Sequence, residues 1–219
     1  MDKDQSPLSA GNFSQWLREI RHALQTDAGM DVACGTCAGC CTSSYFITIR
    51  PRETEVLKRI DRALLVAAPG QSPGTMLMGY DKQGACPQLV NRQCAIYDHR
   101  PETCRSYDCR VFTAAGLVAG GDEKLEINQR VARWQFNYPD TADQAEHDAV
   151  LSAARFIRDN AERFPNHRIA KYPSQLAVFA IKAYELFLDR DISALEPDAK
   201  DTLAKAVMDA VKKFDAAAD

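Results

Sequence analysis

Four cysteines lie close together near the start of the chain, in the run Cys34-x2-Cys37-x2-Cys40-Cys41. The small residues and glycines between them predict a tight, irregular loop that can turn several sulfurs toward one point. Its backbone amides can also stabilise the charge of thiolates. Free thiols at this density are open to oxidation, so the run favours metal ligation. Buried cysteines in a core and a disulfide switch are the alternatives.

Four more cysteines follow at wider spacing, at Cys86, Cys94, Cys104 and Cys109. All eight cysteines therefore lie between positions 34 and 109, and residues 110–219 contain none. A lone Cys94 could pack in a core. The second set as a whole is better explained as further ligands, so we expect most of its members to reach the site of the first four.

The combined pattern reads C-x-x-C-x-x-C-C, then C-P-x-L, then C-x-I-Y-x-x-R-P-x-x-C-R-x-Y-x-C. It resembles the YkgJ-type cysteine-cluster proteins, which are also described as zinc- or iron-chelating domains. The resemblance covers about residues 34–109. It implies metal binding with an iron–sulfur or zinc centre, and it leaves the biochemical role open. A related motif occurs in flagellin lysine methylases, but only the cysteine pattern matches, so that activity is not inferred.

The spacing leaves the metal open between iron–sulfur and zinc. Cys34, Cys37 and Cys40 match the start of the ferredoxin run, and Cys86-Pro87 could supply a remote fourth ligand. Zinc sites prefer paired C-x2–4-C units, for which Cys34/Cys37 and Cys104/Cys109 would serve. An all-sulfur ligand set suits both. We favour an iron–sulfur cluster, with zinc as the alternative, and the eight thiols could fill one centre or two.

Two arginines lie within the last part of the motif. Arg100 and Arg105 could neutralise a thiolate-rich centre and donate hydrogen bonds to sulfur. We therefore include them as residues that contact the cofactor. Surface salt bridges are the alternative for both.

Composition places the chain among ordinary globular proteins. It has 219 residues, 46% hydrophobic and 26% charged, with a net charge of −3. This near-neutral charge does not indicate a positively charged surface for binding nucleic acid or an anionic membrane. The N-terminus lacks the apolar core of a secretory signal, and no segment is apolar enough to span a bilayer. We expect a cytoplasmic and, from its general style, bacterial protein.

Apolar residues recur at helical spacing over most of the chain. The pattern predicts a strand at 45–49, a hairpin of 76–80 with 85–90, and a loose arm over residues 1–11. It also predicts a short helix starting at Pro101. The helices it predicts span 13–24, 56–65, 125–136, 141–164, 173–188 and 198–214.

These elements predict a mainly α fold with a small β element, in which an irregular cysteine-rich metal-binding module packs on a helical scaffold. We divide the chain into an N-terminal arm and helix (1–30), a cysteine-cluster module (31–112) and a helical region (113–219) that packs with the module as one compact unit.

Two functions follow. The first is a redox or electron-handling protein with a cysteine-ligated iron–sulfur cluster. The second is a non-enzymatic zinc module whose helical half binds a protein partner, so that metal binding contributes folding energy. Whether the protein is an enzyme stays open, because no acid, base or nucleophile outside the thiols is identifiable, and nucleotide-binding motifs are missing.

Overall fold

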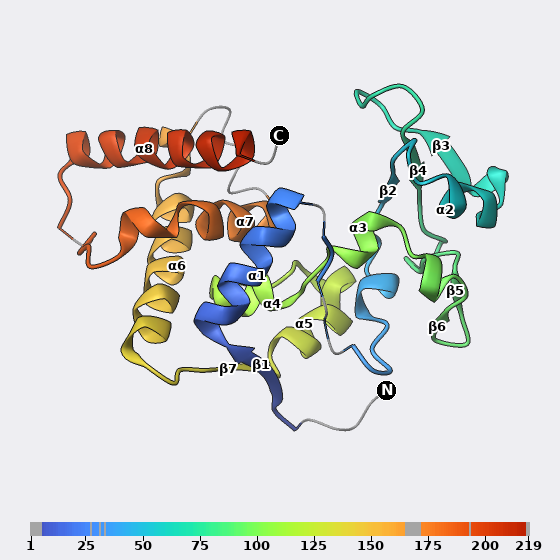
Figure 1. Ribbon diagram of the computed structural model, residues 1–219, viewed down its shortest axis with the longest axis horizontal. Coiled ribbons are helices and arrows are strands. Elements are labelled where there is room, and N and C mark those ends of the chain that lie inside the picture. Colours follow the sequence, from blue (N-terminus) through green and yellow to red (C-terminus); the bar gives the residue numbers. More distant parts are fainter. Residues whose placement is uncertain are drawn as a thin grey trace. The chain divides into compact units, whose positions relative to one another are not determined.

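The computed structural model describes residues 6–26, 28–30, 32, 34–164, 172–192 and 194–217. The contacts divide the chain into two units that each combine separate segments (Figure 1). Unit 1 comprises Met1–Thr26, Cys109–Ala119 and Val131–Asp219. Unit 2 comprises Asp27–Asp108 and Gly120–Arg130.

Unit 1 is a helical assembly. Helix α7 (Pro173–Ala183) packs against α6 (Thr141–Asp159), α8 (Pro197–Ala216) and the short α4 (Arg110–Ala114), and α1 (Phe13–Thr26) packs against α6. Helices α1, α6, α7 and α8 lie in segments whose apolar spacing predicts them, whereas α4 is not predicted. The helix predicted over 141–164 is shorter, because α6 ends at Asp159 and a 3₁₀ turn at Ala161–Arg163 follows it.

The start of α6 is fixed by its own side chains. The Asp140 carboxylate accepts hydrogen bonds from the backbone N–H groups of Ala142 (2.9 Å) and Asp143 (3.0 Å), which would otherwise lack partners at a helix N-terminus. Asp143 accepts in return from the Asp140 N–H, completing a capping box. The Asp143 carboxylate also accepts from the Ser14 N–H at 2.8 Å, which ties α6 to the first turn of α1.

Aromatic rings fill the interior of unit 1 between α1 and the strand that precedes α6. The Phe13 and Trp16 rings lie 5.0 and 4.9 Å from the Phe136 ring, at angles favourable for aromatic pairs. Side chains with almost no exposure complete this core, and they include Leu17, Phe112, Val150, Ile157, Ile181 and Val207.

Two segments of unit 1 differ from the prediction. Residues expected in a loose arm form strand β1 (Leu8–Asn12), which pairs in parallel with β7 (Trp134–Asn137). The predicted helix over 125–136 is therefore wrong beyond α5 (Leu125–Val131). Trp134 and Phe136 are buried while their neighbours are exposed, the period-2 pattern of a strand.

Unit 2 contains a small antiparallel sheet. Strand β4 (Met76–Met78) lies between β2 (Ile47–Ile49) and β3 (Leu65–Ala67). The strand predicted at 45–49 is confirmed over most of its length. The helix predicted over 56–65 is shorter, because α2 (Thr54–Arg59) ends before β3 begins.

The predicted hairpin of 76–80 with 85–90 is wrong, although its turn forms. The Asp81 N–H donates to the Ala85 carbonyl, and Gly84 takes φ +82°, where an added Cβ would lie 2.4 Å from the Ser44 hydroxyl. Beyond the turn, β5 (Leu89–Val90) pairs with β6 (Gln93–Cys94) and not with β4. Strand β4 pairs instead with β2 and with β3, the strand that directly precedes it in the chain.

The apolar core of unit 2 is small. Its cluster at the three-stranded sheet combines buried residues of the strands, of α2 and of the turn between them: Ile49, Val56, Ile60, Leu65 and Met78. The other described helices of the unit are α3 (Glu102–Arg105), at the place where Pro101 predicts a helix start, and α5.

The predicted fold class, mainly α with a small β element, is confirmed. Within the described residues, no helix is both long enough and apolar enough to cross a membrane.

Candidate metal centre

The first cysteine run folds as a tight loop followed by a 3₁₀ turn at Gly39–Thr42. The Cys37 N–H donates to the Cys34 carbonyl at 2.9 Å, and the Gly39 N–H points at the Cys37 sulfur at 3.4 Å. The turn brings the sulfurs of the adjacent Cys40 and Cys41 to 3.9 Å. Whether the loop gathers the sulfurs of Cys34, Cys37 and Cys40 at one point stays a prediction.

Helix α5 packs directly on this loop. A Cβ added to Gly39 would lie 3.3 Å from both the backbone nitrogen and the side chain of Ile127, so the position favours glycine. The Thr42 hydroxyl donates to the Glu126 carboxylate at 2.7 Å, and Arg92 pairs with the same carboxylate. The cysteine loop is thus supported by a segment that contains no cysteine.

The later cysteines reach the loop through the backbone. The Cys86 N–H donates to the Cys41 carbonyl at 2.7 Å, which joins the two parts of the motif. The Leu89 N–H donates to the Cys86 carbonyl, and the β5–β6 pairing places Cys94 opposite Leu89. Cys104 lies on α3.

Electrostatics show that the thiols of unit 2 are neighbours. Burial raises the pKa of Cys104 to about 12, and the charge of Cys41 adds to that effect, as do those of Cys86 and Cys94. Burial also raises the pKa of Cys34, and the charge of Cys37 is the next cause.

Cys40 and Cys41 share one hydrogen bond. With Cys40 as its donor, this bond lowers the pKa of Cys41 to about 7, so Cys41 is the thiol of the pair that ionises first. The same bond, followed by burial, raises the pKa of Cys40, to which the charges of Cys104 and Cys34 contribute. Each of the seven thiols in unit 2 thus has another thiol as an electrostatic neighbour.

Backbone N–H groups also face the sulfurs of the β5–β6 region. Burial raises the pKa values of Cys86 and Cys94, and hydrogen bonds from the N–H groups of Gln88 and Ile96 partly offset this. In both cases the donor lies two residues after the cysteine, as it does at Gly39 and Cys37. Such donors stabilise negative charge on sulfur.

Arg100 is the basic side chain that acts most widely on the thiols. Its charge lowers the pKa values of Cys34, Cys94 and Cys104 against the larger effect of burial, and it lowers the pKa of Cys41 together with the hydrogen bond from Cys40. Its guanidinium lies 3.8 Å from the centre of the Tyr97 ring, in a cation–π contact.

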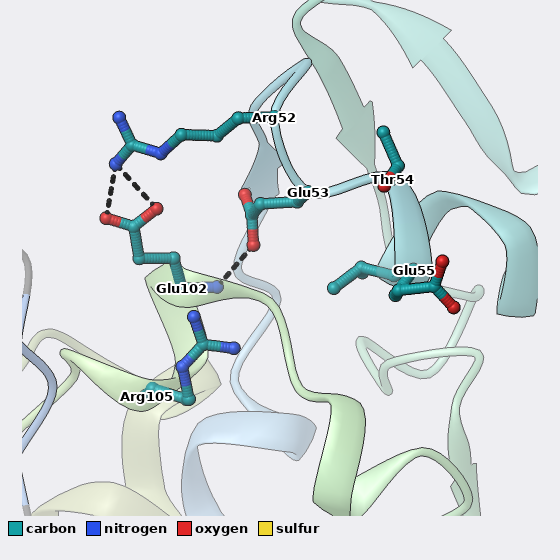
Figure 2. Close-up of a pocket in the computed structure, with 7 residues that line it drawn as sticks. Arg52, Glu53, Thr54, Glu55, Glu102 and Arg105 are labelled. Atoms are coloured by element: carbon teal, nitrogen blue, oxygen red, sulfur yellow. Dashed lines mark hydrogen bonds and ion pairs between the residues drawn. The ribbon is translucent and has the colours of Figure 1, made fainter.

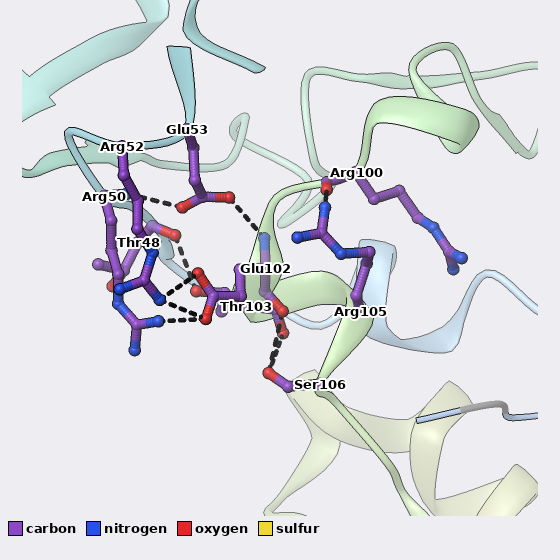
Figure 3. A network of polar contacts seen from close by, with 9 residues as sticks. All are labelled: Thr48, Arg50, Arg52, Glu53, Arg100, Glu102, Thr103, Arg105 and Ser106. Carbon is purple, nitrogen blue, oxygen red and sulfur yellow. Dashed lines mark hydrogen bonds and ion pairs between the residues drawn. The ribbon is translucent and has the colours of Figure 1, made fainter. Parts of the chain in front are cut away.

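Arg105 donates to the backbone carbonyl of Arg100, so it contacts the residue that faces the thiols (Figure 3). Two further charged residues act on the thiols and are not predicted from the sequence. The charge of Arg130 lowers the pKa of Cys34, and the charge of Glu126 raises the pKa of Cys41. No sequence signal identifies either, because both follow the last cysteine by many residues.

Cys109 differs from the other cysteines. It belongs to unit 1, directly before α4, and its sulfur accepts a hydrogen bond from the Trp134 indole N–H at 3.2 Å. Its predicted role as a ligand stays a prediction.

The donor chemistry of unit 2 fits a thiophilic metal. Its seven cysteines are free thiols that are each partly exposed. In the described parts of the chain, however, no three or more Cys, His, Asp or Glu side chains are arranged so that they could hold an ion. The thiols are neighbours without forming a closed ligand shell, so metal binding would draw them together.

Comparison with known proteins also supports metal binding. No curated protein and no solved structure matches the chain. Residues 33–131 match the family model CxxCxxCC, described as "Putative zinc- or iron-chelating domain". The match supports a metal ion as cofactor without deciding between zinc and iron, and it reaches beyond the last cysteine to the end of α5. The match over residues 33–131 confirms the resemblance to the cysteine-cluster family that the motif indicates.

Proposed function

We propose that the seven cysteines of unit 2 hold an iron–sulfur cluster and that the protein handles electrons. The observation that carries the proposal is the mutual proximity of these thiols: Cys34, Cys37, Cys40, Cys41, Cys86, Cys94 and Cys104. Burial and mutual repulsion keep most of them protonated. A bound cation would offset both effects, because metal binding favours the thiolate.

The choice of iron–sulfur depends on the three-cysteine run at residues 34–40, which resembles the start of the ferredoxin motif. When bound, such a cluster supplies one-electron chemistry. The residues of this chain would set its environment: Arg100 with its positive charge, and the N–H groups of Gly39, Gln88 and Ile96 through hydrogen bonds to sulfur. Arg105 would hold Arg100 in place.

Structural zinc is the second candidate, favoured by the small apolar core of unit 2. A unit with so little buried apolar surface gains stability from a metal. In that case the protein is a non-enzymatic module, and its helical unit is the surface for a protein partner.

Anaerobic purification of the full chain distinguishes the two. We expect brown protein with iron, acid-labile sulfide and a paramagnetic signal after reduction. Colourless protein with stoichiometric zinc would establish the second candidate. Protein without bound metal after expression with both metals supplied would refute both.

Substitutions test the ligand assignment. Cys34→Ser, Cys37→Ser and Cys40→Ser should each abolish stoichiometric metal loading. Thr36→Ala changes an exposed residue in the same loop and should leave loading unchanged. Normal metal content in all three cysteine variants would contradict the assignment. Cys109→Ser tests whether the eighth cysteine contributes.

A further inference from the structure

Two cavities in unit 2 adjoin a network of ion pairs around the buried Glu102. Its carboxylate accepts from Arg52 at 2.8 and 2.9 Å and also pairs with Arg50 (Figure 3). The Glu53 carboxylate accepts from the backbone N–H groups of Glu102 and Arg50, both at 2.7 Å. The two arginines are therefore held by a carboxylate whose side chain is only 7% exposed.

The smaller cavity, of about 310 Å³, is not suited to an anion. Arg52 and Arg105 line it together with three carboxylates, those of Glu53, Glu55 and Glu102 (Figure 2). The three carboxylates outnumber the two arginines in this wall, so an anionic ligand would be repelled.

The larger cavity, of about 590 Å³, has a different wall. Both arginines line it, and no carboxylate does. The rest of the wall is Pro51 and five uncharged polar residues, which are Thr48, Gln71, Ser72, Thr75 and Thr103. Its volume lies in the range of small-molecule sites, while its polar wall differs from the apolar wall that most such sites have.

We propose that this larger cavity binds a small molecule through a phosphoryl group. Guanidinium groups match the geometry of phosphate oxygens, and both remain reachable, since the side chains of Arg50 and Arg52 are 44% and 59% exposed. The Thr103 hydroxyl already donates to the Thr48 carbonyl at 2.7 Å, so the other hydroxyls and the Gln71 amide are the donors for further oxygens of the ligand. A phosphoryl group offers more acceptors and more charge than a single carboxylate, which fits two cations and a ring of hydroxyls.

The Glu102 carboxylate positions the two arginines for this task. A guanidinium fixed before the ligand arrives loses less conformational freedom on binding, which improves affinity. Helix α3 carries Thr103 of this cavity next to Cys104 of the thiol cluster. The proposal itself does not depend on a metal.

The test is calorimetric titration of the full-length, anaerobically purified chain with inorganic phosphate at constant ionic strength. We expect saturable binding of one phosphate. Arg52→Gln should weaken this binding about tenfold or more, while the ion pair between Arg50 and Glu102 stays in place. The double substitution Gln71→Ala with Ser72→Ala alters only exposed loop residues and should weaken binding several-fold without affecting folding. Arg59→Gln removes an exposed arginine outside the cavity and serves as the control.

Three results would overturn the proposal. The first is the absence of saturable phosphate binding. The second is equal weakening by Arg52→Gln and Arg59→Gln, which would indicate a general charge effect. The third is tighter binding of citrate than of phosphate, which would assign the cavity to carboxylates. Metal content, measured on the same samples, reports separately on the proposed cluster.

Discussion

Unit 1 and unit 2 are stabilised by different interactions. Unit 1 buries aromatic and aliphatic side chains between long helices, with Phe13 and Trp16 almost inaccessible. Unit 2 consists of short helices, short strands and loops, with a small apolar cluster at its sheet and Ile127 buried beside the cysteine loop, and it also contains ion pairs and a group of thiols. Long helices bury more apolar surface than short elements do. Seven of the eight cysteines therefore lie in the unit in which apolar burial contributes less to stability.

The largest expected effect comes from removing the metal. Unit 2 should lose most of its amide protection while α1, α6 and α7 keep theirs, because structural metals contribute on the order of 10 kcal/mol to such folds. Hydrogen exchange with mass spectrometry, before and after anaerobic chelation or acid release, measures this. Equal protection of β2–β4–β3 in both states would show that unit 2 does not depend on metal.

A core truncation should act on unit 1 alone. Phe13→Ala removes a fully buried ring that contacts Trp16 and Phe136, and we expect a loss of about 3 to 5 kcal/mol. Urea unfolding followed by far-UV circular dichroism measures it, and metal content should not change. The matched variant Phe46→Ala removes a ring that is 58% exposed and should change stability by less than about 0.5 kcal/mol.

The ion-pair network of unit 2 can be weakened without changing its shape. Glu102→Gln replaces a carboxylate that accepts from two arginines, and charge-assisted hydrogen bonds of this kind predict a loss of about 1 to 3 kcal/mol. Chemical unfolding monitored by hydrogen exchange in β2 measures the change. Glu55→Gln alters an exposed pair with Lys58 and provides the control. A Glu102 variant as stable as the control would mean that the network contributes little.

The smallest effect concerns acid stability of unit 1. Hydrogen bonds from the Ser14 N–H hold the pKa of Asp143 below its ordinary value. A lowered folded-state pKa contributes stability that is fully present above the unfolded pKa of about 3.9 and is lost as the pH falls through the folded value. Asp143→Asn should cost about 1 kcal/mol near neutral pH and should flatten the pH dependence below pH 4. Unfolding curves at pH 3 to 7 test this, and an unchanged pH profile would contradict it.

Local pattern was sufficient for much of the scaffold. The apolar spacing identified α1, α6, α7 and α8, since a helix must place its buried residues on one face. It failed at β7: Trp134 and Phe136 alternate with exposed residues as in a strand, but the predicted helix over 125–136 included them. It also failed for the segment after β4, because residues 89–90 form β5, which pairs with β6 and not with β4.

The sequence by itself determined that the reactive sulfurs are concentrated in one stretch and that a cysteine-cluster domain contains them, because residue type and short-range spacing define that motif. Only the tertiary structure decided which distant groups surround them. It placed α5 against Gly39, directed the charge of Arg130 to Cys34 and held two arginines on Glu102. Such contacts join residues far apart along the chain, and they are selected by how surfaces pack and charges pair, which no local periodicity encodes.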